Sequence, residues 1–137
     1  MSEKQKVLVV EDNPHTRFLV NAVLQAEGYS VIAAEDGRQA MEKLQDQNLM
    51  SEISLIFLDI LMPHVNGLDI LSAVKSTAQT SSIPVIMLTT RDMAEDFIVG
   101  YNKGADYYIP KPFTRQQLLY GINMVLYGEE EEEQAHT

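Results

Sequence analysis

The chain has 137 residues, of which 45% are hydrophobic and 22% charged, as expected for one globular domain with a full core. No apolar run approaches the ~20 residues of a membrane-spanning helix, and the polar start lacks a secretory signal, so we expect a cytoplasmic protein. The absence of cysteine excludes disulfides and thiol chemistry. The formal net charge of −10 argues against nucleic-acid binding.

Apolar stretches that fit strands alternate along the chain with stretches of helical period. A strand is expected over Lys6–Val10 and a helix over Pro14–Glu27, because Asn13 before a proline is a typical helix start and Gly28 a typical stop. The elements after this helix are expected, in chain order, at Ser30–Ala33 (strand), Gly37–Gln47 (helix), Leu55–Leu58 (strand), Leu68–Thr77 (helix), Pro84–Leu88 (strand), Ala94–Lys103 (helix), Tyr107–Ile109 (strand) and Arg115–Tyr127 (helix).

Five strand–helix units in alternation predict a doubly wound α/β domain with a five-stranded parallel sheet. The first, third and fourth strands are almost continuously aliphatic, as is typical of central strands that are buried on both faces. The second and fifth are more polar and are expected at the edges. We expect residues 1–128 to form the domain and residues 129–137, which include five consecutive glutamates, to be a disordered acidic tail.

Polar residues stand at the carboxyl end of four apolar strands. They are Glu11 and Asp12, then Asp59, then Thr89 and Thr90, and finally Lys111. Because the carboxyl ends of parallel strands meet at one edge of a sheet, these side chains should converge. Three carboxylates, a hydroxyl and an ammonium group can together hold a divalent cation and a phosphoryl group.

With these residues the chain resembles the CheY-like receiver domain of two-component response regulators, from Lys4 to about Tyr127. The matching motifs are Val9-Val10-Glu11-Asp12-Asn13, Leu58-Asp59-Ile60-Leu61-Met62-Pro63 with Gly67, Leu88-Thr89-Thr90, and the run from Lys103 to Phe113. Each motif alone is weak evidence, but all four in order are specific. The resemblance implies a flavodoxin-like (βα)5 fold with strand order 2-1-3-4-5, in which the first and third strands are neighbours.

The resemblance also implies a role for each polar residue. Asp59 is expected to accept a phosphoryl group from a histidine kinase or a histidine phosphotransfer protein. Lys111 is expected to pair with the phosphoryl oxygens, and Thr89 to donate a hydrogen bond to one of them after transfer. Tyr108 matches the aromatic switch position of the family. The peptide bond before Pro112 is expected to be cis.

Three carboxylates at close range repel unless a cation lies between them, and Mg²⁺ prefers such oxygen ligands. We expect Asp12 and Asp59 to bind Mg²⁺ directly. Glu11 is expected to act through water, because its side chain is one methylene longer than the aspartate that is commoner at this position in the family. The resemblance adds the backbone carbonyl of Leu61 as a ligand. The apolar Leu61 side chain is expected to position hydrolytic water poorly and so to slow autodephosphorylation.

These expectations describe a phosphorylation-driven switch that catalyses its own phosphotransfer and dephosphorylation, and not a metabolic enzyme. Its output is expected through contact with a downstream protein, without nucleic-acid or membrane binding by this domain. The expected contact face consists of the helix at 94–103, the strand at 107–109 and the helix at 115–127. Its aromatic residues are Phe97, Tyr101, Tyr108 and Tyr120.

Three other functions fit the fold but fit the residues less well. A binding module that works without phosphorylation would not need to retain all four of the polar residues Asp12, Asp59, Thr89 and Lys111. A hydrolase resembling the haloacid-dehalogenase family needs a second acid two residues after the nucleophile, where this chain has Leu61. A flavin-binding protein needs a loop rich in glycine, serine and threonine after the first strand, and none follows Val10.

Overall fold

The computed structural model describes residues 5–62, 65–90 and 104–128. Its parallel sheet has the order β2-β1-β3-β4-β5, which confirms the expected doubly wound topology. The strands are β1 (Lys6–Val10), β2 (Ser30–Ala34), β3 (Ile53–Asp59), β4 (Val85–Thr90) and β5 (Tyr107–Lys111). The helices are α1 (Pro14–Ala26), α2 (Gly37–Leu44), α3 (Gln47–Met50), α4 (Gly67–Lys75) and α6 (Arg115–Tyr127). The helix expected at 94–103 and the tail at 129–137 lie outside the described residues.

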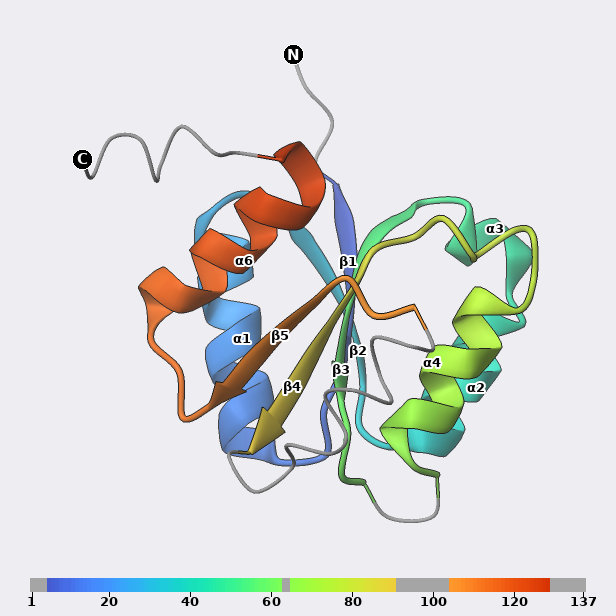
Figure 1. Ribbon diagram of the computed structural model, residues 1–137, viewed down its shortest axis with the longest axis horizontal. Coiled ribbons are helices and arrows are strands. Elements are labelled where there is room, and N and C mark those ends of the chain that lie inside the picture. Colours follow the sequence, from blue (N-terminus) through green and yellow to red (C-terminus); the bar gives the residue numbers. More distant parts are fainter. Residues whose placement is uncertain (1–4, 63–64, 91–103, 129–137) are drawn as a thin grey trace.

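Helices cover both faces of the sheet (Figure 1): α1 and α6 lie on one face, and α2, α3 and α4 on the other. Successive residues of a central strand therefore enter different cores. In β1, Val7 and Val9 pack with α1 and α6, whereas Leu8 and Val10 pack with the opposite helices. All four are fully buried. Burial on both faces explains why the central strands are almost continuously apolar up to their polar carboxyl ends.

The register of the strands brings the polar residues to one edge of the sheet. Val10 of β1 lies opposite Leu58 of β3, so the residues that follow them, Glu11 and Asp59, are neighbours. On the other side of β3, Asp59 lies opposite Leu88 of β4. The order of the strands thus places β1 and β4 on either side of the strand that ends in Asp59.

The ends of α1 and α6 match the local signals in the sequence. The Asn13 side chain caps α1 by accepting hydrogen bonds from the backbone N–H groups of His15 and Thr16, at 2.9 and 3.0 Å. Thr114 and Gln117 form a reciprocal capping box at the start of α6. Gly128 ends α6 in the left-handed conformation, with φ of 58°.

The helix expected over Gly37–Gln47 is wrong at its end, because α2 stops at Leu44 and α3 begins at Gln47. The backbone N–H of Asp46 bonds the carbonyl of Lys43, three residues back, which tightens the last turn. The Asp46 side chain then accepts a hydrogen bond from the backbone N–H of Leu49 at 3.0 Å and caps the new helix. An aspartate that can start a helix competes with continuation of the preceding one.

Other boundaries differ from the expected ones by one or two residues. Strand β3 starts at Ile53 rather than Leu55, and helix α4 ends at Lys75 rather than Thr77. The fourth and fifth strands extend to Thr90 and Lys111, so these polar residues lie within strands. Among the described residues, no helix is both long and apolar enough to cross a bilayer.

Candidate functional site

Three acids meet where β1 and β3 end. One carboxylate oxygen from each of Glu11, Asp12 and Asp59 lies within 4.8 Å of the other two. Glu11 is 0% exposed and Asp59 4%, so two of the three carboxylates are removed from solvent. They face a cavity of about 420 Å³. The expected site residues that line this cavity are Glu11, Asp12, Asp59, Leu61, Thr89 and Lys111.

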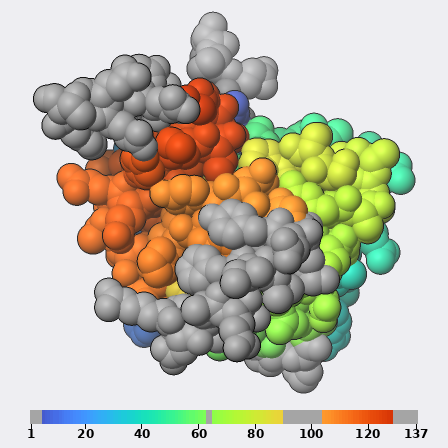
Figure 2. All heavy atoms as spheres, in the orientation of Figure 1, coloured from blue at the N-terminus to red at the C-terminus, as the bar shows by residue number. Residues whose placement is uncertain are grey.

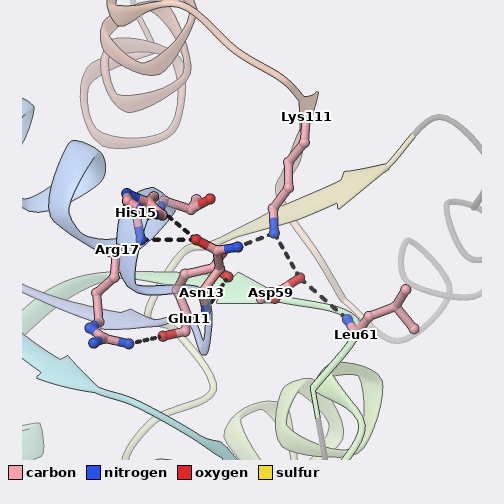
Figure 3. Close-up of polar contacts among 8 residues, drawn as sticks. Glu11, Asn13, His15, Arg17, Asp59, Leu61 and Lys111 are labelled. Carbon is pink, nitrogen blue, oxygen red and sulfur yellow. Dashed lines mark hydrogen bonds and ion pairs between the residues drawn. The ribbon is translucent and has the colours of Figure 1, made fainter.

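Lys111 reaches into the site from the end of β5 (Figure 3). Its Nζ atom lies 3.1 Å from Oε1 of Glu11 and 3.3 Å from Oδ1 of Asp59. The peptide bond that joins Lys111 to Pro112 is cis. The ammonium group therefore lies between two buried carboxylates that come from different strands.

The Glu11 side chain is directed into the site by contacts on both of its sides. Its Oε2 atom accepts a hydrogen bond from the backbone N–H of Asn13 at 3.0 Å. Its Oε1 atom has the ion pair with Lys111 but no hydrogen bond of good geometry. The Glu11 backbone carbonyl accepts a hydrogen bond from Nη1 of Arg17 at 2.9 Å, which anchors the residue to α1. Asn13 thus contributes through its main chain, which no side-chain pattern in the sequence could indicate.

Asp59 lies at the centre of this charge distribution. Burial and, after it, the neighbouring charge of Glu11 raise the pKa of its carboxyl from 3.8 to about 8, although Lys111 opposes both effects. Its Oδ1 atom accepts a hydrogen bond from the backbone N–H of Leu61 at 3.3 Å. One ammonium group therefore leaves the three acids with excess negative charge, and this favours a bound cation.

Gly67 allows the helix after β3 to start against the backbone of Asp59. A Cβ atom at Gly67 would lie 2.1 Å from the Asp59 carbonyl oxygen and 2.7 Å from the Ile60 Cα. The Gly67 N–H donates a hydrogen bond to the Ile60 carbonyl at 2.8 Å, and the Asn66 side chain caps α4 by accepting from Leu68 N–H at 2.7 Å. Only glycine fits this close approach.

A family model for the response regulator receiver domain matches residues 7–123. The chain belongs to this family. Receiver domains are the phosphoacceptor switches of two-component signalling, so the expected fold and function class are confirmed.

This receiver domain is similar to several known regulators. It is 42% identical over 121 residues to the transcriptional regulatory protein CpxR of Escherichia coli strain K12, across 88% of this chain and 49% of that protein. It is 33% identical to protein PilH of Pseudomonas aeruginosa PAO1, across 90% of this chain and 98% of PilH. The chain thus spans about half the length of CpxR but nearly all of PilH.

The solved structures show the same relationship. The chemotaxis response regulator CheY4 of Vibrio cholerae superposes with a TM-score of 0.82 at 35% identity, covering 90% of this chain and all of CheY4. The receiver domain of NtrX from Brucella abortus gives a TM-score of 0.79 at 29% identity and covers 90% of this chain.

The acids of this receiver domain suit the Mg²⁺ that receiver domains bind at an acidic pocket. Mg²⁺ prefers oxygen ligands and retains several waters, which a half-open site with three carboxylates can accommodate. Two observations favour a cation here: the buried Oε1 of Glu11 has an ion pair but no well-directed hydrogen bond, and the pKa of Asp59 is raised. The donor set therefore fits Mg²⁺.

The two expected switch residues lie in different places. Thr89, in β4, is 2% exposed and lines the acidic cavity. Tyr108, in β5, is 6% exposed, packs with the core on the α2 and α4 side, and does not line that cavity. It instead lines a larger cavity of about 740 Å³ together with Tyr107 and Tyr120. Of the two, only the threonine thus lines the cavity that Asp59 faces.

Proposed function

We propose that this receiver domain accepts a phosphoryl group on Asp59 from the phosphohistidine of a histidine kinase or a phosphotransfer protein. The observation that carries the proposal is the position of the Asp59 carboxylate, buried beside the cavity between the Lys111 ammonium and two further acids. Among the described carboxylates, only Glu11 and Asp59 have both a lysine contact and a place in this cluster, and Asp59 is the less deeply buried of the two, at 4% exposed against 0%.

In the proposed reaction a carboxylate oxygen of Asp59 forms a bond to phosphorus. The bond between phosphorus and the donor's imidazole nitrogen breaks, and that nitrogen takes up a proton. Lys111 moves from its carboxylate partners to the oxygens of the transferred group. Its Nζ atom is already 3.3 Å from Oδ1 of Asp59, so only a small movement of the side chain is needed. The Thr89 hydroxyl, at the end of the neighbouring strand, donates a hydrogen bond to another of these oxygens.

Bound Mg²⁺ would supply positive charge that keeps Asp59 ionised and offsets the charge of the incoming phosphoryl group. We assign Asp12 and Asp59 as direct ligands and Glu11 as a ligand through water, since both Glu11 oxygens already have partners, Oε2 in Asn13 N–H and Oε1 in Lys111, whereas only Oδ1 of Asp59 has such contacts. The Leu61 carbonyl completes the proposed set. The Leu61 N–H bond to Asp59 keeps this part of the backbone close to the acid.

The proposed output is a change in protein contacts and not turnover of a substrate. We place it on the face of β5 and α6, shown in orange to red in Figure 2. The cavity of about 740 Å³ on this face is lined by aromatic residues, including Tyr108 at the switch position. Phe97 and Tyr101, which we expected on this face, lie outside the described residues. The net charge of −10 supports a protein partner over nucleic acid. The proposed dependence on a kinase that uses ATP supports a location in the cytoplasm.

The proposed function is tested by intact-mass measurement after incubation with acetyl phosphate and Mg²⁺. We expect the wild type to gain the mass of one phosphoryl group, because acetyl phosphate presents the same electrophile as a phosphohistidine. The Asp59→Asn variant and wild type without Mg²⁺ should gain nothing. An unmodified wild type in the presence of bound Mg²⁺ would contradict the proposal.

The side chain of Leu61 is 53% exposed at the cavity, where it offers water no hydrogen-bond partner. We expect Leu61→Asn to shorten the half-life of the phosphorylated form by about 3–10-fold, the effect of one hydrogen bond to the attacking water. The loss of phosphoryl mass is followed after removal of acetyl phosphate. Leu61→Met, which keeps the position apolar, is the matched control and should leave the half-life unchanged. Equal half-lives for Leu61→Asn and wild type would show that this position does not limit hydrolysis.

A further inference from the structure

The first residue of α2, Gly37, is buried against the segment that follows the phosphoacceptor. A Cβ atom at Gly37 would lie 2.3 Å from the Cβ of Val65 and 3.1 Å from both of its Cγ atoms. Gly37 is not among the glycines with positive φ, so an alanine here meets a steric barrier and not a conformational one. The blocking atom is a Cβ, which cannot move away by changing rotamer.

Val65 connects this contact to the phosphoacceptor. It lies two residues before Gly67, whose Cα approaches the Asp59 carbonyl so closely that no side chain fits. The Gly67 N–H is in turn bonded to the Ile60 carbonyl. The N-terminus of α2, the N-terminus of α4 and the end of β3 are therefore in direct contact, and α2 and α4 pack side by side (Figure 1).

The N-terminus of α2 is itself joined to the other acids. The carbonyl of Ala34, the last residue of β2, accepts a hydrogen bond from the Glu11 N–H at 3.1 Å. The turn from Ala34 to Gly37 is held by the Asp36 side chain, which accepts from Gln39 N–H at 2.8 Å. The Gln39 side chain accepts from Glu35 N–H at 2.9 Å. This turn thus bridges Glu11 on one side and, through Val65, the Asp59 segment on the other.

We infer that Gly37 is a positioning residue of the metal site: its contact with Val65 sets the spacing between the Asp59–Gly67 segment and the acids after β1. This inference rests on the proposed Mg²⁺ site and deepens it. Mg²⁺ demands near-octahedral geometry with ligands at about 2.0–2.1 Å, so a shift of a few tenths of an ångström between the two groups of ligands weakens binding. A methyl group at Gly37 forces such a shift, because 2.3 Å is far below a carbon–carbon contact.

The test is the dissociation constant of Mg²⁺ for the unphosphorylated protein, measured by calorimetric titration, in a double-mutant cycle. Gly37→Ala should weaken Mg²⁺ binding about 10-fold, as supporting residues of metal sites typically do. Val65→Gly removes the Cβ that blocks position 37. In that background Gly37→Ala should change the dissociation constant less than about 2-fold, since the clash no longer exists.

Gly121→Ala is the matched control. A Cβ at Gly121 would also be crowded, at 3.1 Å from the tips of the Ile109 and Tyr107 side chains, but it lies in α6 away from the acids. We expect this variant to lower the melting temperature without changing Mg²⁺ affinity. Should Gly37→Ala fail to fold, Val65→Ala, which introduces no clash, should still weaken Mg²⁺ binding relative to Gly121→Ala.

Two results would overturn the inference. One is a Gly37→Ala protein with a lower melting temperature and wild-type Mg²⁺ affinity, which would make the contact purely structural. The other is that Gly37→Ala weakens Mg²⁺ binding equally in the wild-type and the Val65→Gly backgrounds, which would mean that the effect does not pass through this contact. Because Mg²⁺ is titrated without phosphorylation, failure of the acetyl phosphate reaction in the wild type remains a separate result that concerns the proposed function.

Discussion

Replacement of Lys111 by alanine is expected to slow phosphorylation of Asp59 about 100-fold and, at the same time, to tighten Mg²⁺ binding. The ammonium group lies 3.1 and 3.3 Å from two of the three carboxylates, so Mg²⁺ must share them with it. Removing one positive charge at this range should raise the Mg²⁺ affinity by about 10-fold. The same change removes the cation that stabilises the phosphoryl oxygens during transfer.

The two effects are measured separately. Calorimetric titration gives the Mg²⁺ affinity, and the initial rate of mass gain from acetyl phosphate at saturating Mg²⁺ gives the rate of phosphorylation. Lys75→Ala is the matched control, because Lys75 is similarly shielded (17% exposed against 21%) and paired with an acid, Asp106, outside the site. It should alter neither quantity. Weaker Mg²⁺ binding in Lys111→Ala would mean that the lysine supports the metal site instead of competing with the ion.

The second large effect is expected in the stability of Asp59→Asn. Burial, and then the charge of Glu11, raise the pKa of Asp59 from 3.8 in the unfolded chain to about 8 in the folded one. Between these values the folded protein retains a proton that the unfolded chain has released. The free energy of unfolding of the wild type should therefore fall as pH rises from about 4 to about 8, and it should level off above that.

Asparagine cannot ionise, so the free energy of unfolding of Asp59→Asn should not fall in this way as the pH rises. We expect it to be more stable than the wild type by about 1–3 kcal/mol at pH 8 and equally stable near pH 4, since it removes a poorly compensated buried charge. The measurement is urea unfolding of both proteins at pH 4, 6 and 8 without divalent cations. Saturating Mg²⁺ should reduce the difference at pH 8, because only the wild type has the full set of carboxylates to bind it. A stability difference that does not change with pH would contradict the explanation.

Much of this receiver domain could be predicted from the sequence because its signals are local. The aliphatic runs at Val7–Val10 and Leu55–Leu58 indicate strands buried on both faces, and Asn13 and Gly128 are typical of the helix ends that they occupy. Polar residues after these runs predict a site at one edge of the sheet, where the structure places Asp59 and Lys111 together. The motifs led to the correct family for the same reason, since each is a short, continuous stretch.

Where two local signals compete, periodicity alone is insufficient. The helical period continues through Gln47, but the Asp46 side chain caps a new helix and ends α2 at Leu44. Which of the two wins depends on packing against the rest of the protein, since a helical turn and a capped break differ by only about 1 kcal/mol.

The sequence by itself determined the class of fold, the strand positions and the set of acids, hydroxyl and lysine that form the site. The tertiary structure alone decided that Tyr108 lies outside the acidic cavity, that Asn13 N–H orients Glu11, and that Gly37 packs against Val65. The physical reason is distance along the chain. Local patterns set the strands and helices, whereas contacts between remote residues depend on strand register and on the close packing of helices against one another.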